Sequence, residues 1–183
     1  LAAVLALALG LGLALVAVLR GGALRAAILA GADVVATAPS VLLVIAVGGL
    51  TGARGTAAIA ILVAVPRAAD TARLLVAELE ALLARPFADA ARALGATPTR
   101  VLVRHALPSA WPLIATATAL TAASAVLAEA ALSFLGLGVP PPTPSWGELL
   151  AQASQHDLRW WLSLPAGAVI TLTAAALLRV ARR

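Results

Sequence analysis

Residues 1–19, LAAVLALALGLGLALVAVL, form a stretch of sequence in which no side chain is charged or polar. A helix rises about 1.5 Å per residue, so a helix of this length covers most of the roughly 30 Å of a bilayer's hydrocarbon core. The first charged residue, Arg20, follows it directly. The stretch is therefore predicted to cross a membrane as a helix.

The composition of the whole chain also favours a lipid environment. Of its 183 residues, 62% are hydrophobic and 11% are charged, whereas about a quarter of the residues of a soluble domain are charged. A soluble domain of this size could not bury so much apolar surface. The expected fold class is therefore an all-α, polytopic membrane protein.

Several kinds of chemistry are excluded by the residue types that the chain lacks. It has no cysteine, and hence no disulfide, thiol nucleophile or thiolate metal site. It has no lysine either, and because a P-loop requires Gly-Lys-Ser/Thr, ATP is not expected to bind here in that way. The net charge of +5 comes from arginines placed between apolar runs, which favours membrane topology over nucleic-acid binding.

Four further apolar stretches are long enough to be spans, which gives about five transmembrane helices. They cover residues 26–50, 56–75, 110–136 and 160–178. Two polar segments lie between them. Residues 78–108 have the pattern of an amphipathic helical loop, and residues 139–159 are first Pro-rich and then polar.

The positions of arginine and tryptophan predict an orientation. Cytoplasmic loops are enriched in arginine, and most arginines of this chain fall on the side that holds residues 78–108 and the C-terminus. That side is expected to be cytoplasmic, and residues 139–159 extracytoplasmic. Trp111 and the pair Trp160 and Trp161 begin the fourth and fifth spans, at the interfacial depth that indole rings favour.

The loop of residues 78–108 is predicted to contain a helical hairpin. Pro86 suits the first turn of a short helix with an apolar face, and Gly95 suits its C-terminal cap. Thr97 and Pro98 then resemble an N-cap and first turn, opening a second helix that Pro108 is expected to end. The apolar face is formed by Phe87, Ala90, Ala91 and Leu94, and Asp89 and Arg92 lie on another.

Three parts of this hairpin match a known pattern: Asp89-Ala90-Ala91, then Gly95, then His105-Ala106-Leu107-Pro108. They resemble the EAA loop of bacterial import permeases, which docks in a cleft of an ATPase subunit. The family usually has glutamate at the position of Asp89. The charge is kept, but the side chain is about one methylene shorter.

A second run resembles the dipeptide, oligopeptide and nickel branch of these permeases. It comprises residues 127–138, LAEAALSFLGLG, followed by residues 141–147, PPTPSWG. The resemblance is strong from about Arg85 onward, and it implies that residues 1–183 form a single type I transmembrane domain of an ABC importer. Family members usually carry one more N-terminal span and an outer segment, so an N-terminal span is expected to be missing.

The resemblance implies a function without catalysis by this chain. It would be the permease subunit of an ATP-driven importer of dipeptides, oligopeptides or nickel in a bacterial or archaeal cytoplasmic membrane. The implied partners are a second permease subunit, two cytoplasmic ATPases that bind ATP and Mg, and an extracytoplasmic solute-binding protein. No cofactor, metal or nucleic acid is expected on this chain. The implied ATPase-coupling residues are Asp89, Ala90, Ala91, Gly95, His105, Leu107 and Pro108.

Two other hypotheses about the function stay open, and one of them rests on acidic residues within the spans. Glu129 is the acid deepest in a span, and it is expected to face the transport pathway or a subunit interface. An ion-coupled secondary carrier would use Asp33, Asp70 and Glu129, although Asp33, Arg67 and Asp70 are expected near the inner membrane surface. A purely structural membrane anchor is the third hypothesis, and neither alternative explains the hairpin motif.

Overall fold

Helices are the only regular elements in the part of the chain that this computed structural model describes, which is residues 1–37, 42, 46, 56–138, 143–155 and 160–181. The long helices are α1 (Ala2–Arg20), α2 (Gly22–Thr37), α4 (Thr56–Leu83), α8 (Trp111–Phe134) and α10 (Trp160–Ala181). The short elements are α5 (Pro86–Ala93), α6 (Pro98–Val101), the π-helix η1 (Leu102–Ala106), α7 (Leu107–Ser109) and α9 (Trp146–Gln155). The predicted all-α fold class is confirmed.

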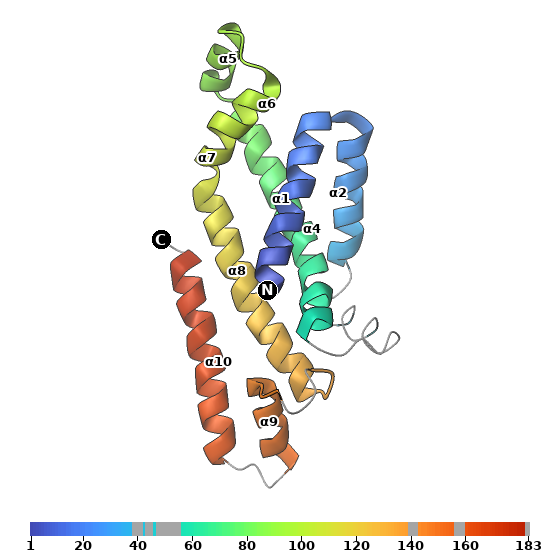
Figure 1. Ribbon diagram of the computed structural model, residues 1–183, viewed down its shortest axis with the longest axis vertical. Helices are drawn as coiled ribbons and strands as arrows, with labels where there is room; N and C mark the ends of the chain where they lie inside the picture. The colour runs from blue at the N-terminus through green and yellow to red at the C-terminus, as the bar shows by residue number, and fades with distance from the viewer. Residues whose placement is uncertain (38–41, 43–45, 47–55, 139–142, 156–159, 182–183) are drawn as a thin grey trace.

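The long helices lie side by side along the longest dimension of the molecule (Figure 1). One end carries α5 and α6, and we call it the hairpin end. α1 and α4 run toward the hairpin end, whereas α2 and α8 run away from it, and α9 lies at the opposite end beside the start of α10 (Figure 1). α1 packs mainly on α4, and α8 packs mainly on α10 and α9.

Small residues make the contact between α1 and α4. The buried residues of α1 are Ala6, Gly10, Ala14 and Ala17, three or four positions apart on one face. A Cβ added at Gly10 would lie 2.8 Å from the carbonyl oxygen of Ala68 in α4, so the two backbones are very close there. Larger side chains of α1 lie at its margins, where Leu7, Leu11 and Leu15 are partly buried, or on its outer face, where Leu9, Leu13 and Leu19 are exposed. This is the arrangement of membrane helices, which pack through small side chains because lipid already solvates the large apolar ones.

Large side chains are buried mainly at the hairpin end. Leu75 and Leu79 of α4, Leu102 of η1 and Ile114 of α8 belong to one apolar cluster, which also includes Ala17 of α1. Leu75, Leu79 and Leu102 are completely buried. The second arm of the hairpin therefore packs on an apolar cluster to which α1, α4 and α8 all contribute.

Among the described residues, three helices are long and apolar enough to cross a membrane by length and composition, namely α1, α8 and α10 as far as Arg179. They match the first, fourth and fifth predicted spans. The second predicted span, residues 26–50, lies partly outside the described residues. The third forms the beginning of α4, which continues to Leu83 because Leu75, Leu79 and Leu82 remain on its buried face. Residues 78–83 of the predicted loop therefore belong to this long helix.

Candidate functional site

The turn between α5 and α6 has the geometry of a Schellman motif. The Gly95 N–H donates to the Arg92 carbonyl at 2.9 Å, and the Ala96 N–H donates to the Ala91 carbonyl at 3.0 Å. Gly95 has a φ of 82°, a left-handed conformation that costs a residue with a Cβ about 1–2 kcal/mol. Pro86 occupies the first turn of α5, where no backbone donor is needed. The local sequence thus specifies a rigid turn at Gly95, as predicted.

The second arm of the hairpin begins at Thr97, also as predicted. The Thr97 side chain accepts a hydrogen bond from the Arg100 N–H at 3.3 Å, and Pro98 follows it in the first turn of α6. The predicted helix end at Pro108 is wrong. The Leu107 N–H bonds to the Leu102 carbonyl five residues earlier, and this π-helical turn is followed by α7, which includes Pro108. A widened turn accommodates the proline ring, which would clash with the i−4 carbonyl of a regular α-helix.

This π-helical passage connects the hairpin directly to a membrane span. The Ala110 N–H donates to the Ala106 carbonyl at 3.0 Å, and the Ile114 N–H donates to the Ala110 carbonyl at 3.0 Å. Backbone hydrogen bonds therefore continue from η1 through Ala110 into α8.

Most of the predicted apolar face of α5 is open. Only Ala88 of α5 is completely buried, and Ala91 is half-buried. Phe87 and Ala90 are exposed, and Leu94, at the tip of the hairpin, is 89% exposed. The hairpin thus presents apolar side chains that the described helices of this chain do not cover.

Asp89 has a local structural role. It lies in the first turn of α5, where the helix dipole favours a negative charge. Its carboxylate accepts a hydrogen bond from Arg92 at 2.8 Å, and Arg92 also donates to the Leu83 carbonyl at 3.2 Å. An exposed ion pair of this kind contributes roughly 0–1 kcal/mol. Its main effect is to hold α5 in one orientation against the end of α4.

The other predicted coupling residues follow on the second arm. The exposed His105 ring lies 6.4 Å from the Phe87 ring, so η1 and α5 are in contact across the hairpin. Leu107 packs against the apolar cluster at the base, and Pro108 is exposed. The predicted set therefore comes together in one hairpin, with Asp89, Ala90, Ala91 and Gly95 in or directly after its first arm.

Arginines gather around this hairpin. Arg20 ends α1, Arg25 lies in the first turn of α2, and Arg85, Arg100 and Arg104 lie in the hairpin itself. The end of α10 lies beside the first half of α8, since the Thr116 hydroxyl donates to the Ala181 carbonyl at 3.1 Å. Of the arginines that the sequence assigns to one side, Arg20, Arg25, Arg85, Arg100 and Arg104 are thus at the hairpin end.

One of these arginines forms a bidentate ion pair. The Arg25 guanidinium donates from Nε to one carboxylate oxygen of Glu80, and from Nη2 to the other at 2.8 Å. These hydrogen bonds hold the pKa of Glu80 below its usual value, although partial burial acts in the opposite direction. The pair joins the beginning of α2 to the last turns of α4, next to the hairpin.

Glu129 lies near the other end of α8. Its carboxylate accepts a hydrogen bond from the Ser133 hydroxyl at 2.7 Å, and Ser133 is only 2% exposed. Two glycines crowd Ser133, because a Cβ at Gly138 or Gly147 would collide with it. Glu129 is thus hydrogen-bonded to a residue of the close contact between α8 and α9.

Helix α9 is absent from the sequence-based prediction, which treats residues 139–159 as a loop. A recognisable signal exists, since Ser145 and Glu148 have the spacing of a capping box. The Glu148 N–H donates to the Ser145 hydroxyl oxygen at 3.1 Å. Residues 139–142 and 156–159, including His156, lie outside the described residues.

The three acids of the carrier hypothesis do not share a site. Asp33 of α2 pairs with Arg73 of α4 at 3.1 Å, and Asp70 pairs with Arg67 on α4 at 3.5 Å. Glu129 has its own partner near the far end of α8. Among the described residues, no three His, Asp or Glu side chains come together in a way that could hold a metal ion.

The predicted position of Arg67 and Asp70 near the inner membrane surface stays a prediction, but the structure shows which part of the bundle they face. Both line a cavity to which Ala117, Leu120, Thr121 and Ser124, in the middle third of α8, also contribute. On the other side, Ala68 and Thr71 are in contact range of Gly10, at the middle of α1. α4 extends about eight residues beyond the predicted third span, and this places the Arg67–Asp70 pair farther from the hairpin end than expected.

Sequence comparisons relate the chain to known transport proteins. A family model described as "binding-protein-dependent transport system inner membrane component" matches residues 6–183. A Brucella suis protein named as a peptide transport system permease is 38% identical over 149 residues, which are 79% of this chain and 49% of that protein. A Brucella ovis protein named as a peptide permease is 32% identical over 176 residues, 94% of this chain and 58% of that protein.

A third relative, from Sinorhizobium fredii, is named as a peptide ABC transporter permease. It is 40% identical over 115 residues, which are 63% of this chain and 39% of that protein. The chain thus spans about half the length of the curated relatives it matches. Because the family model covers nearly the whole sequence, the chain belongs to the family of inner membrane components of binding-protein-dependent transport systems.

Proposed function

We propose that this chain forms one membrane-spanning half of an ATP-driven peptide importer and transmits motion from an ATPase to the transport path. The observation that carries this proposal is the apolar-tipped hairpin. Leu94 and Phe87 are exposed on it, yet its turn is fixed by the Schellman motif at Gly95. An exposed apolar surface on a rigid support is typical of a docking site.

The base of the hairpin supports a role in transmission. Leu102 and Ala106 of η1 are completely buried against Leu79 and Ile114, and interiors packed in this way transmit strain. A force on the hairpin would therefore move α4 and α8 together. By this mechanism, closure of the ATPases would switch the spans between inward-open and outward-open arrangements.

The arginines at the hairpin end support a cytoplasmic position for the hairpin, because cytoplasmic loops are enriched in arginine. The opposite end, with α9, would then face a solute-binding protein. ATP and Mg would be bound by two ATPase subunits, and a second permease subunit would complete the path. The names of the relatives support peptides as the cargo, and in such a system this chain makes and breaks no bonds.

Substitution of Gly95 by valine tests the docking role. A Cβ there meets no heavy atom within 4 Å, so the substitution acts through the left-handed backbone conformation alone. Gly136 is a matched control: its φ is 75°, its Cβ position is equally open, and it ends α8 in the same motif. Both variants should insert in the membrane, because Gly95 lies outside the predicted spans and Gly136 follows the last residue of α8.

The two variants should differ in their binding of the ATPase. With the assembled transporter in detergent, Gly95→Val is expected to lower co-purification of the ATPase about tenfold, and ATP-dependent peptide uptake with it. Gly136→Val should retain the ATPase. Equal retention by both variants would contradict docking through the hairpin. Peptide uptake that continues without ATP and stops when the proton gradient is removed would instead support an ion-coupled carrier.

A further inference from the structure

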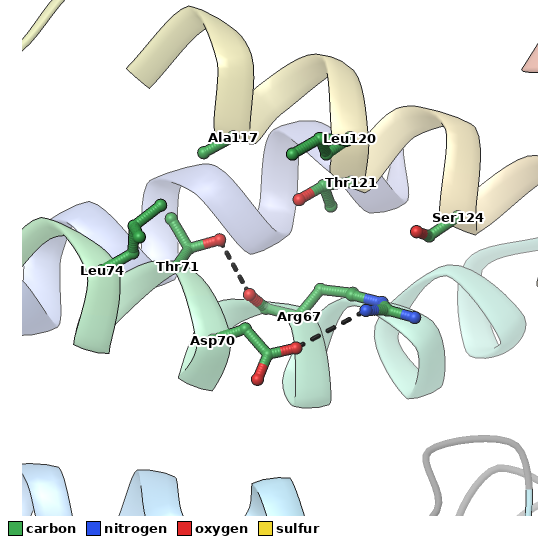
Figure 2. Close-up of a pocket in the computed structure, with 8 residues that line it drawn as sticks. All are labelled: Arg67, Asp70, Thr71, Leu74, Ala117, Leu120, Thr121 and Ser124. Atoms are coloured by element: carbon green, nitrogen blue, oxygen red, sulfur yellow. Dashed lines mark hydrogen bonds and ion pairs between the residues drawn. The ribbon is translucent and has the colours of Figure 1, made fainter. Parts of the chain in front are cut away.

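A cavity with charged and hydroxyl groups lies between α4 and α8, well away from the hairpin (Figure 2). Its volume is about 240 Å³. The α4 side contributes Arg67, Asp70, Thr71 and Leu74. The α8 side contributes Ala117, Leu120, Thr121 and Ser124. Sequence reasoning missed this site because α8 and α4 are far apart in the chain.

The depth of the cavity makes its charges unusual. Its α8 residues occupy the middle of a helix that is long and apolar enough to span a membrane. Ionisable side chains at that depth are costly and face protein interiors or water-filled cavities rather than lipid. Arg67 and Asp70 therefore indicate a polar compartment inside the bundle, which in a transport protein is a candidate part of the solute path.

Arg67 is only weakly satisfied by its partner. The distance from its Nη1 to the Asp70 carboxylate is 3.5 Å, whereas strong charge-assisted hydrogen bonds measure about 2.7–2.9 Å. The side chains of Arg67 and Asp70 are 33% and 50% exposed. Figure 2 shows the Arg67 side chain extending along the groove below Ser124. Its guanidinium can thus accept a second carboxylate.

Two hydroxyl groups stand opposite this guanidinium. Thr121 and Ser124 lie on the side of α8 that faces α4 (Figure 2). Neither hydroxyl donates a hydrogen bond to another described residue, although neighbouring hydroxyls on α8 do so. Thr71, across the groove, already donates to the Arg67 carbonyl at 2.8 Å. The free donors of the cavity are therefore concentrated around Arg67, which suits an anionic group.

We propose that this cavity is a transient binding site for the terminal carboxylate of a peptide passing through the membrane, held by Arg67 and by the hydroxyls of Thr121 and Ser124. The proposal rests on the proposed function as a peptide importer. The volume is below the roughly 300–1,000 Å³ of typical small-molecule sites, so the cavity takes a peptide terminus and not a whole peptide.

Asp70 makes such binding reversible. Its carboxylate pairs with Arg67 when the cavity is empty. The carboxylate of an incoming peptide would therefore replace the Asp70 carboxylate as the partner of Arg67. An unpaired arginine at this depth would hold an anion too tightly for release, and transport requires binding that is weak enough to reverse. The bulk of the peptide would face the open side of the groove.

The test uses the complete transporter in proteoliposomes, with its binding protein and internal ATP, and measures uptake of trialanine and of trialanine amide. The binding protein contributes its own preference between the two peptides, but that preference is identical for every variant. The quantity to compare is therefore the ratio of acid to amide uptake. Arg67→Gln is expected to lower this ratio about tenfold or more, the usual effect of losing a hydrogen bond to a charged group.

Arg73→Gln is the matched control, since Arg73 lies on the same helix and is also paired with an aspartate, but it does not line the cavity. It should leave the ratio unchanged. Thr121→Val removes one hydroxyl from a buried, nearly isosteric side chain and should lower the ratio about threefold to fivefold. If Arg67→Gln does not assemble, the uptake ratio of Thr121→Val still tests the proposed carboxylate site.

The possible failures are distinguishable. If the wild-type transporter takes up neither peptide, the proposed function as a peptide importer is overturned, and the carboxylate site with it. If it takes up both and the ratio is unchanged in Arg67→Gln and Thr121→Val, only the carboxylate site is overturned. Loss of the second permease subunit from Arg67→Gln, together with an unchanged ratio in Thr121→Val, would make the cavity an assembly contact and also overturn the site.

Discussion

At the scale of single residues, glycine serves two different purposes in this chain. Gly95 and Gly136 have positive φ and open surroundings, so they are needed for their backbone conformation. Gly10 and Gly147 have close neighbours from another helix, so they are needed for their lack of a side chain. The distinction determines which substitutions each position tolerates.

Gly147→Ala should destabilise the packing of α9 on α8. Its Cβ would collide with the Ala130 carbonyl oxygen and would lie 2.7 Å from the Ser133 Cβ, and both of these atoms belong to α8. Overpacking of this kind costs about 1–3 kcal/mol, which corresponds to several degrees in the melting temperature of a chain of this size. The apparent melting temperature in detergent measures the effect.

Gly167→Ala in α10 is the matched control, since its Cβ would meet no heavy atom within 4 Å. There the alanine should stabilise the helix by about 0.5–1 kcal/mol through its better helix propensity. The two glycine-to-alanine changes should therefore shift the melting temperature in opposite directions. A drop of equal size in both would mean that α9 does not pack on α8 as closely as described.

The residues that the sequence could identify are those with local partners. Gly95 and Thr97 were predictable because a cap depends on neighbours within four positions of the chain. The Ser133 partner of Glu129 is equally local, but its burial depends on α9 and is not visible in the sequence. The cavity around Arg67 depends on an approach of α4 to α8, and no local pattern encodes it.

At the scale of elements, the end of a helix is determined by its packing as much as by its own sequence. Glu78 and Glu80 suggest that the third span has ended, but every third or fourth residue of α4 is still buried as far as Leu82. Similarly, Pro108 suggests a helix end, and the π-helical turn before it allows helical backbone to continue. Charged residues and prolines are therefore weak boundary signals in helices that extend beyond the lipid.

The ion pair between α2 and α4 should make stability depend on pH. Arg25 lowers the pKa of Glu80 in the folded state, so the folded protein binds a proton there less readily than the unfolded chain. The pair thus stabilises the fold above the ordinary glutamate pKa of about 4.3, and this contribution is lost as the pH falls through the lower, folded-state pKa. Glu80→Gln should lose it at every pH.

Melting curves of wild type and Glu80→Gln between pH 7 and pH 3 measure this dependence. The wild type should melt about 1–3 °C higher at pH 7, and the difference should shrink toward pH 3. Glu78→Gln is the control, because Glu78 forms no ion pair with a described residue. A difference for Glu80→Gln that is constant with pH would show that the carboxylate's charge does not support this contact.

At the scale of the whole molecule, hydropathy predicted which segments form long apolar helices, and the arginines indicated which loops lie together. α1, α8 and α10 coincide with three predicted spans, and five of the arginines assigned to one side lie at the hairpin end. Such features follow from transfer between water and lipid, which acts on each segment separately. The contacts between helices were not predictable, because small residues occur throughout this alanine-rich chain and only a few of them face another helix.

The two ends of the bundle should lie on opposite sides of the membrane, and the absence of native cysteine makes this directly measurable. Leu94→Cys places a thiol at the tip of the hairpin and Thr143→Cys places one just before α9, both at exposed positions. In intact cells that produce the chain without its ATPases, a membrane-impermeant maleimide should label Thr143→Cys. It should reach Leu94→Cys only after the membrane is permeabilised.

Leu172→Cys is the control, since it is exposed at the middle of α10 and should resist the reagent in both conditions because lipid surrounds it. Labelling of the hairpin thiol from outside would reverse the orientation argued from arginine, and labelling of both thiols from one side would contradict a membrane-spanning bundle between them.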